Sequence, residues 1–163
     1  YLVRLGDGDT VPDKIILLDF GAVRDFPEDL LELARNFTKA SVTRNKEMML
    51  AAMNGFSFFD AMPIEVKNGI SELFFLAVEP FTDLTTAPPE AVTADGRYIW
   101  AKSNLHNRVM VGAAKSATNR HFSVPPKELM FISRKFVGAY TFMTVIDAQV
   151  DGQKLLAPFL AKF

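Results

Sequence analysis

The sequence contains no cysteine and almost no net charge, and each absence excludes a class of protein. Without cysteine there can be no disulfide framework, no zinc site with thiolate ligands and no thiol nucleophile. The 18 lysine and arginine residues nearly cancel the 19 aspartate and glutamate residues. The chain therefore has no net field that would attract nucleic acid or an anionic membrane, and we expect no nucleic-acid partner.

Long apolar runs are also rare. Residues 129–146 form a run about as long as a segment that crosses a bilayer, but Arg134 and Lys135 lie within its first half. We interpret this run as a buried or half-buried helix, and we predict no transmembrane segment. The chain begins without an initiator methionine or a signal-peptide core, which indicates a domain cut out of a longer protein.

What is present suffices for one compact domain over residues 1–163. Hydrophobic residues make up 49% of the chain and aromatic residues 12%, which is enough for a substantial core. Residues 1–5 alternate apolar and polar side chains, residues 6–10 have turn chemistry, and residues 14–18 are a β-branched and aliphatic run. This order predicts a short N-terminal β-hairpin.

From residue 25 the pattern is helical almost to the end. An acidic cap at Asp25, an early proline and Glu28 indicate the first helix start. Further helices are predicted at 46–53, from 63 to Pro80, near 105–116, after 125–126 and near the C-terminus. Residues 82–96 are predicted to form a flexible connection. The fold class is therefore mainly α with an N-terminal hairpin. Three helices have clear apolar stripes. They are Leu30, Leu33, Ala34, Phe37 and Ser41 in the first, Val66, Ile70, Leu73, Phe74, Ala77, Val78 and Phe81 in the helix from 63 to Pro80, and Leu129, Ile132, Phe136, Tyr140, Met143 and Ile146 in the helix after 125–126.

The most specific chemical pattern is Asp19, Phe20 and Gly21, directly after the predicted second strand. A carboxylate at a strand end, followed by a glycine that lets the backbone turn, can coordinate magnesium on nucleotide phosphates. The same tripeptide is also typical of a simple strand-terminating turn with a core phenylalanine. The three residues alone leave both interpretations open.

The residues around Asp19 favour the magnesium-ligand interpretation over the simple turn. The run Asp-Phe-Gly-Ala-Val-Arg at 19–24, leading straight into a helix, resembles the UbiB/AarF family of atypical kinases. Residues 1–8 are similar to the strand and turn that follow the catalytic loop in this family, and residues 45–56 to its small-residue helix ending in Gly-Phe. Residues 124–129 with 132–135 resemble its Pro-Pro-initiated helix carrying Arg-Lys, whereas residues 82–104 match nothing in it.

This resemblance implies the C-lobe portion of a protein-kinase-like fold. Asp19 would be the magnesium ligand, positioned by Phe20 and Gly21, and the full-length protein would bind Mg²⁺ and ATP and support ubiquinone (isoprenoid quinone) biosynthesis. The implied partners are nucleotide and quinone-pathway proteins or a lipid membrane surface, in the bacterial cytoplasm or at its membrane, or in eukaryotic organelles. The family's other catalytic residues would lie upstream of Tyr1, so the chain alone is expected to be inactive.

Two alternatives remain open at this point. The chain could be a non-catalytic helical interaction module or a pseudokinase fragment, in which Asp19 merely ends a strand. The aminoglycoside and choline kinase group shares the lobe architecture, but it has Asp-Trp/Phe-Glu where this chain has Asp19, Phe20 and Gly21.

The remaining polar candidates are expected to be structural. His106 and His121 lack acidic partners at ligand spacing, which favours solvent-facing or capping roles. Arg24 is expected in a structural ion pair. The acidic residues Asp60, Glu65, Glu72 and Glu79 are expected on the wet faces of helices. The apolar residues Met48, Met49, Met53, Phe56, Phe58 and Phe59 are dense enough for an exposed docking patch.

Overall fold

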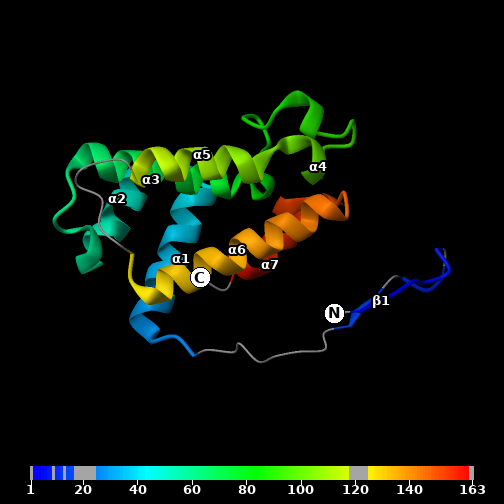
Figure 1. Cartoon of the computed structure of the whole chain (residues 1–163), viewed down its shortest axis with the longest axis horizontal. Coiled ribbons are helices and arrows are strands. Elements are labelled where there is room, and N and C mark those ends of the chain that lie inside the picture. Colours follow the sequence, from blue (N-terminus) through cyan, green and yellow to red (C-terminus); the bar gives the residue numbers. More distant parts are fainter. Residues whose placement is uncertain (1, 9, 13, 17–24, 118–124, 162–163) are drawn as a thin grey trace.

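The computed structural model describes residues 2–8, 10–12, 14–16, 25–117 and 125–161. Strands β1 (Leu2–Arg4) and β2 (Lys14–Ile16) pair antiparallel, with Leu2 opposite Ile16, so the predicted hairpin is confirmed. The Asp7 carboxylate accepts hydrogen bonds from the backbone N–H groups of Thr10 (2.8 Å) and Val11 (2.7 Å) in the connecting turn. The rest of the described chain is mainly helical, as predicted (Figure 1).

The hairpin stands to one side of the helical body in Figure 1. Three of its apolar side chains are largely exposed: Leu2 is 55% exposed, Leu5 76% and Ile15 53%. Two short strands are only marginally stable by themselves, because such a pair buries little apolar surface. The fold is therefore held together by the helices, and the hairpin adds little to the core.

The first core lies between α1 (Glu28–Val42), α2 (Lys46–Asn54), the 3-10 turn η1 (Ser57–Phe59) and α3 (Ile64–Ala77). The start of α2 is fixed by Asn45, whose side chain accepts a hydrogen bond from the Met48 N–H at 2.9 Å. Prolines occupy the N-cap positions of α1 and α3, where a missing N–H costs nothing. The buried members of this first cluster are Leu30, Leu33, Phe37, Ala40, Met49, Met53, Phe59, Met62, Val66 and Phe75.

The expected docking patch of methionines and phenylalanines is instead part of this core. Met49 and Met53 are fully buried, and Phe59 is stacked on Phe37 with ring centroids 5.8 Å apart. Met48, Phe56 and Phe58 are half-buried and pack against the same cluster. Flexible thioethers and aromatic rings fill the irregular space between three short elements, so their density reflects packing.

A second core joins the middle and the end of the chain. Strand β3 (Tyr98–Ile99) pairs antiparallel with β4 (Gln149–Val150), and the short helix α4 (Trp100–Ser103) follows β3 directly. The turns η2 (Glu79–Phe81) and η3 (Pro89–Ala91) and the helix α7 (Gly152–Leu160) lie around this pair. The buried members of this second cluster are Tyr98, Trp100, Leu105 and Tyr140.

The connection over residues 82–96 has more structure than we expected. It contains η3, the fully buried Ala91 and a bridge between Val92 and Tyr98. The Thr93 N–H also donates to the Arg97 carbonyl at 2.9 Å. The prediction of a flexible connection was therefore wrong, since the bridge and the Thr93–Arg97 hydrogen bond join residues only six and four positions apart.

Helices α5 (Leu105–Ala117) and α6 (Lys127–Val145) complete the body. The predicted buried stripe of α6 is only partly correct, because Phe136 is 51% and Ile146 50% exposed, whereas Tyr140 is buried. No helix in the described ranges is long and apolar enough to cross a membrane, in agreement with our interpretation of residues 129–146.

Gly152 lies where α7 meets η2, and a side chain there would have no room. A Cβ atom at this position would lie 1.9 Å from the Pro80 carbonyl oxygen. Gly152→Ala should therefore lower the free energy of unfolding by about 1–3 kcal/mol in urea titrations. In Gly138→Ala the new Cβ meets nothing within 4 Å, so this control should raise stability by about 0.5–1 kcal/mol. Equal effects of the two changes would contradict the close approach.

Candidate functional site

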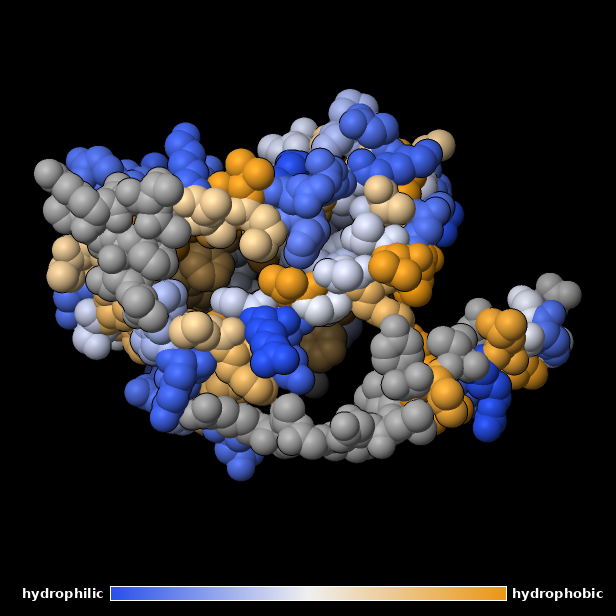
Figure 2. Space-filling view, in the orientation of Figure 1, coloured by the Kyte–Doolittle hydropathy of each residue, from blue (hydrophilic) through white to orange (hydrophobic). Residues whose placement is uncertain are grey.

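The described residues form an apolar cavity of about 350 Å³ between α1, α3, α5 and α6. We call it the four-helix cavity. Figure 2 shows apolar side chains gathered around a hollow in the helical body. The cavity is lined by Leu30, Leu33, Ala34, Phe37, Thr38, Ser41, Phe59, Leu73, Phe74, Ala77, Val78, His106, Val109, Met110, Ala113, Leu129, Ile132, Ser133, Phe136, Val137 and Tyr140.

The lining of the cavity follows from the apolar periodicity of the four helices. Each of the four helices contributes apolar residues spaced by three and four positions, which places them on one face. The stripe predicted for the first helix, from Leu30 to Ser41, lines the cavity in full. Small side chains at Ala34, Ala77 and Ala113 leave the space that larger residues would fill. The stripes were predictable from the sequence, whereas the gap between them was not.

Three of the four hydroxyl side chains that line the cavity donate to helix carbonyls. Thr38 Oγ1 donates to the Ala34 carbonyl and Ser133 Oγ to the Leu129 carbonyl, each at 2.8 Å. The Tyr140 hydroxyl donates to the Ala77 carbonyl, and burial raises the pKa of this hydroxyl. These three hydroxyl groups therefore offer a ligand no free hydrogen. The other polar side chains of the lining are Ser41 and His106, and the lining contains no aspartate, glutamate, lysine or arginine.

An empty cavity of this size would lower the stability of the fold. At about 24 cal/mol per Å³, a closed empty cavity of 350 Å³ would cost about 8 kcal/mol, which is comparable to the whole stability of a domain. The four-helix cavity is partly open, so its cost is smaller, but the apolar lining still gains free energy when water is excluded.

A buried ionic cluster lies beside the cavity. Arg108 donates to both carboxylate oxygens of Glu79, at 2.8 and 2.7 Å, and the Tyr98 hydroxyl donates to Glu79 Oε1 at 2.8 Å. The Glu79 side chain is 1% exposed and the Arg108 side chain 30%. Hydrogen bonding to Glu79 raises the pKa of Arg108, and burial raises the pKa of Tyr98. The cluster ties η2 to β3 and α5.

The position of Glu79 in this cluster contradicts one of our predictions. We expected Glu79 on the wet face of a helix, but it lies in the second core, whereas Asp60, Glu65 and Glu72 are exposed as expected. In α3 and the turn after it, Ser71, Phe75 and Glu79 are buried on a different face from the predicted stripe, whose members Leu73, Phe74, Ala77 and Val78 line the four-helix cavity. Glu79 lies four positions after Phe75, and this spacing could have revealed it.

The predicted magnesium residues Asp19, Phe20 and Gly21 lie outside the described residues, as do Arg24 and His121. His106 is half-buried and lines the four-helix cavity. Within the described ranges, no group of three or more histidine, aspartate or glutamate side chains is placed to hold a metal ion. No family model, curated protein or solved structure matches this chain.

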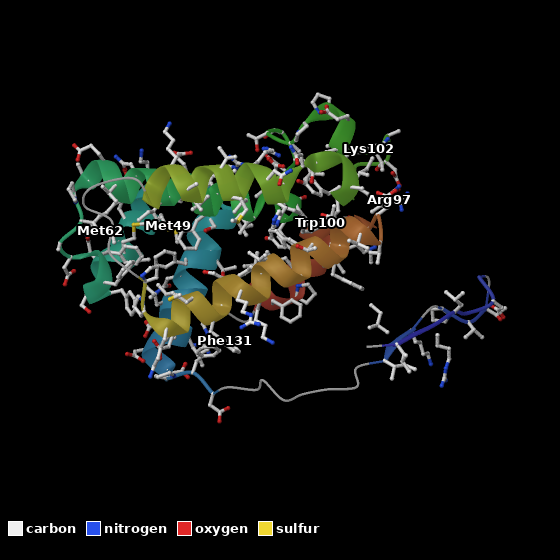
Figure 3. All side chains as sticks on the ribbon, viewed as in Figure 1. Met49, Met62, Arg97, Trp100, Lys102 and Phe131 are labelled. Atoms are coloured by element: carbon white, nitrogen blue, oxygen red, sulfur yellow. The ribbon has the colours of Figure 1, made fainter. Side chains whose placement is uncertain are left out.

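Figure 3 places the labelled residues relative to these features. Trp100 lies between α4 and α6, and its ring meets Tyr140 with centroids 4.8 Å apart. Met49 lies inside the first core, whereas Arg97 and Lys102 lie at the outer edge near β3 and α4. Phe131, at the other end of α6, contacts Phe26 with ring centroids 6.1 Å apart.

Proposed function

We propose that this chain is the C-lobe portion of a kinase-like domain of the UbiB/AarF type. In the full-length protein, an atypical kinase or ATPase that supports ubiquinone biosynthesis, Asp19 holds Mg²⁺ on the phosphates of ATP. The observation that carries this proposal is the run Asp-Phe-Gly-Ala-Val-Arg at 19–24, between a strand and a helix. The other catalytic groups belong to parts of the protein upstream of Tyr1, so the isolated chain is inactive in this proposal.

The described residues on either side of the motif support the proposal. Strand β2 is formed up to Ile16, and α1 begins at Glu28, so residues 19–24 connect a strand to a helix. Phe26 is half-buried and packs against Phe131 of α6, which fixes the chain just after the motif on the helical body. A metal ligand needs such an anchor, because phosphoryl transfer depends on positioning.

A non-catalytic interaction module is the second candidate. It is favoured by the exposed apolar side chains of the hairpin, such as Leu2 and Ile15. In this case Asp19 ends a strand and the full-length protein hydrolyses no ATP. The two candidates therefore differ in the activity of the unmodified protein and in the effect of changing one carboxylate.

Asp19→Asn in the full-length protein tests the proposal. Asparagine keeps the size of the side chain but removes the charge that binds Mg²⁺, so ATP hydrolysis should fall by at least about 100-fold. The change should leave the unfolding temperature nearly unaltered. Asp25→Asn is the matched control, since Asp25 is exposed and lies just before α1, and it should keep full activity. Undiminished turnover in Asp19→Asn, or no turnover in the unmodified protein, would contradict the proposal.

A further inference from the structure

We propose that the four-helix cavity is a binding site for a neutral apolar small molecule of roughly a dozen carbon atoms. This inference stands on the helices alone and does not depend on the magnesium-nucleotide proposal. The size follows from the volume: an apolar cavity of about 150 Å³ accommodates benzene, and this one has about 350 Å³.

The charge of the ligand follows from the lining. None of the lining residues is an aspartate, glutamate, lysine or arginine, and the hydroxyls of Thr38, Ser133 and Tyr140 donate to helix carbonyls. An ammonium group in this space would lose its water without gaining an anionic partner, and the half-buried His106 is the only lining side chain that could pair with a carboxylate. A hydrocarbon chain or ring system loses nothing on entry, so the cavity selects neutral molecules.

The shape of the site favours a small molecule over a protein segment. The walls come from four different helices around a partly open space, and in Figure 1 α6 crosses α1 and runs at an angle to α5. A flat docking surface would present one or two helices instead. An added peptide backbone would also bring N–H and C=O groups into a lining that has few groups to satisfy them.

Ala113→Phe on α5 is the central test, because it places a ring in the cavity without removing a hydrogen-bonding group. Its matched control is Ala114→Phe, since Ala114 is exposed, is the next residue of the same helix and does not line the cavity. Biphenyl is a neutral probe of the expected size, and biphenyl-4-carboxylate is its charged counterpart.

Calorimetric unfolding of the 163-residue chain provides the readout. Biphenyl near its solubility limit should raise the unfolding temperature of the unmodified chain and of Ala114→Phe by about 3 °C. It should leave Ala113→Phe unchanged, and the carboxylate should shift none of the three. If Ala113→Phe shows no cooperative transition, Ala34→Phe on α1, which also lines the cavity, takes its place.

Three results would overturn the proposal. The first is no shift with biphenyl in the unmodified chain. The second is an equal shift in Ala113→Phe or with the carboxylate, which would indicate binding elsewhere on the surface. The third is an unfolding temperature that rises with protein concentration without biphenyl and loses this dependence in Ala113→Phe, since a second copy of the chain would then fill the cavity.

Discussion

Glu79→Ala should lower the free energy of unfolding by about 3–5 kcal/mol, nearer the lower value because Arg108 is 30% exposed. The substitution removes the carboxylate that accepts two hydrogen bonds from Arg108 and one from Tyr98. It leaves a guanidinium and a phenol partly or wholly buried without this partner. Urea titration, followed over the whole transition, measures the loss.

The exposed Glu72 on α3 provides the matched control, and Glu72→Ala should change stability by less than about 0.5 kcal/mol. Adding Arg108→Ala to Glu79→Ala should restore part of the loss, because the unpaired charge disappears. A loss below about 1 kcal/mol in Glu79→Ala would mean that water satisfies Arg108 and that the cluster does not hold η2, β3 and α5 together.

Trp100→Ala should be similarly damaging, with a loss of about 3–5 kcal/mol. Trp100 is 2% exposed and its ring packs edge-on against Tyr98 and Tyr140, with centroid distances of 5.6 and 4.8 Å. Truncation would leave a large empty space between β3, α4 and α6. The free energy of unfolding from urea titration is again the measurement.

Trp100→Phe separates ring packing from hydrogen bonding. The Trp100 Nε1–H has no hydrogen-bond partner among the described residues, so phenylalanine removes an unsatisfied donor while it keeps most of the ring contacts. This variant should lose less than about 1.5 kcal/mol. If it lost as much as Trp100→Ala, the indole N–H would have to make a bond that stabilises the second core.

Much of the helical architecture follows from local sequence signals. Asn45 and the prolines at 27 and 63 mark the helix starts that the structure has, because caps and missing N–H groups act within one turn. The β3–β4 pair was not predicted, since two residues on each strand give no period. Its partners are also far apart in the sequence, so only tertiary packing brings them together.

In the candidate site, too, local features were predictable from the sequence and tertiary features were not. The apolar stripe from Leu30 to Ser41 predicted which face of α1 points into the helical body. The four-helix cavity could not be predicted, because it depends on the spacing between the apolar faces of four helices. Glu79 was misjudged because a carboxylate in an amphipathic helix is usually exposed, and the compensating Arg108 lies on another helix. Charge pairing across helices has no signature in a single sequence.

The two cores differ in their chromophores. Trp100 is the only tryptophan of the chain, and it lies with Tyr98 and Tyr140 in the second core. The first core contains phenylalanine as its only kind of aromatic residue. Intrinsic emission therefore reports on one half of the helical body, while the far-ultraviolet dichroism of the helices reports on both. Coincidence of the two optical signals would show that both halves melt as one cooperative unit.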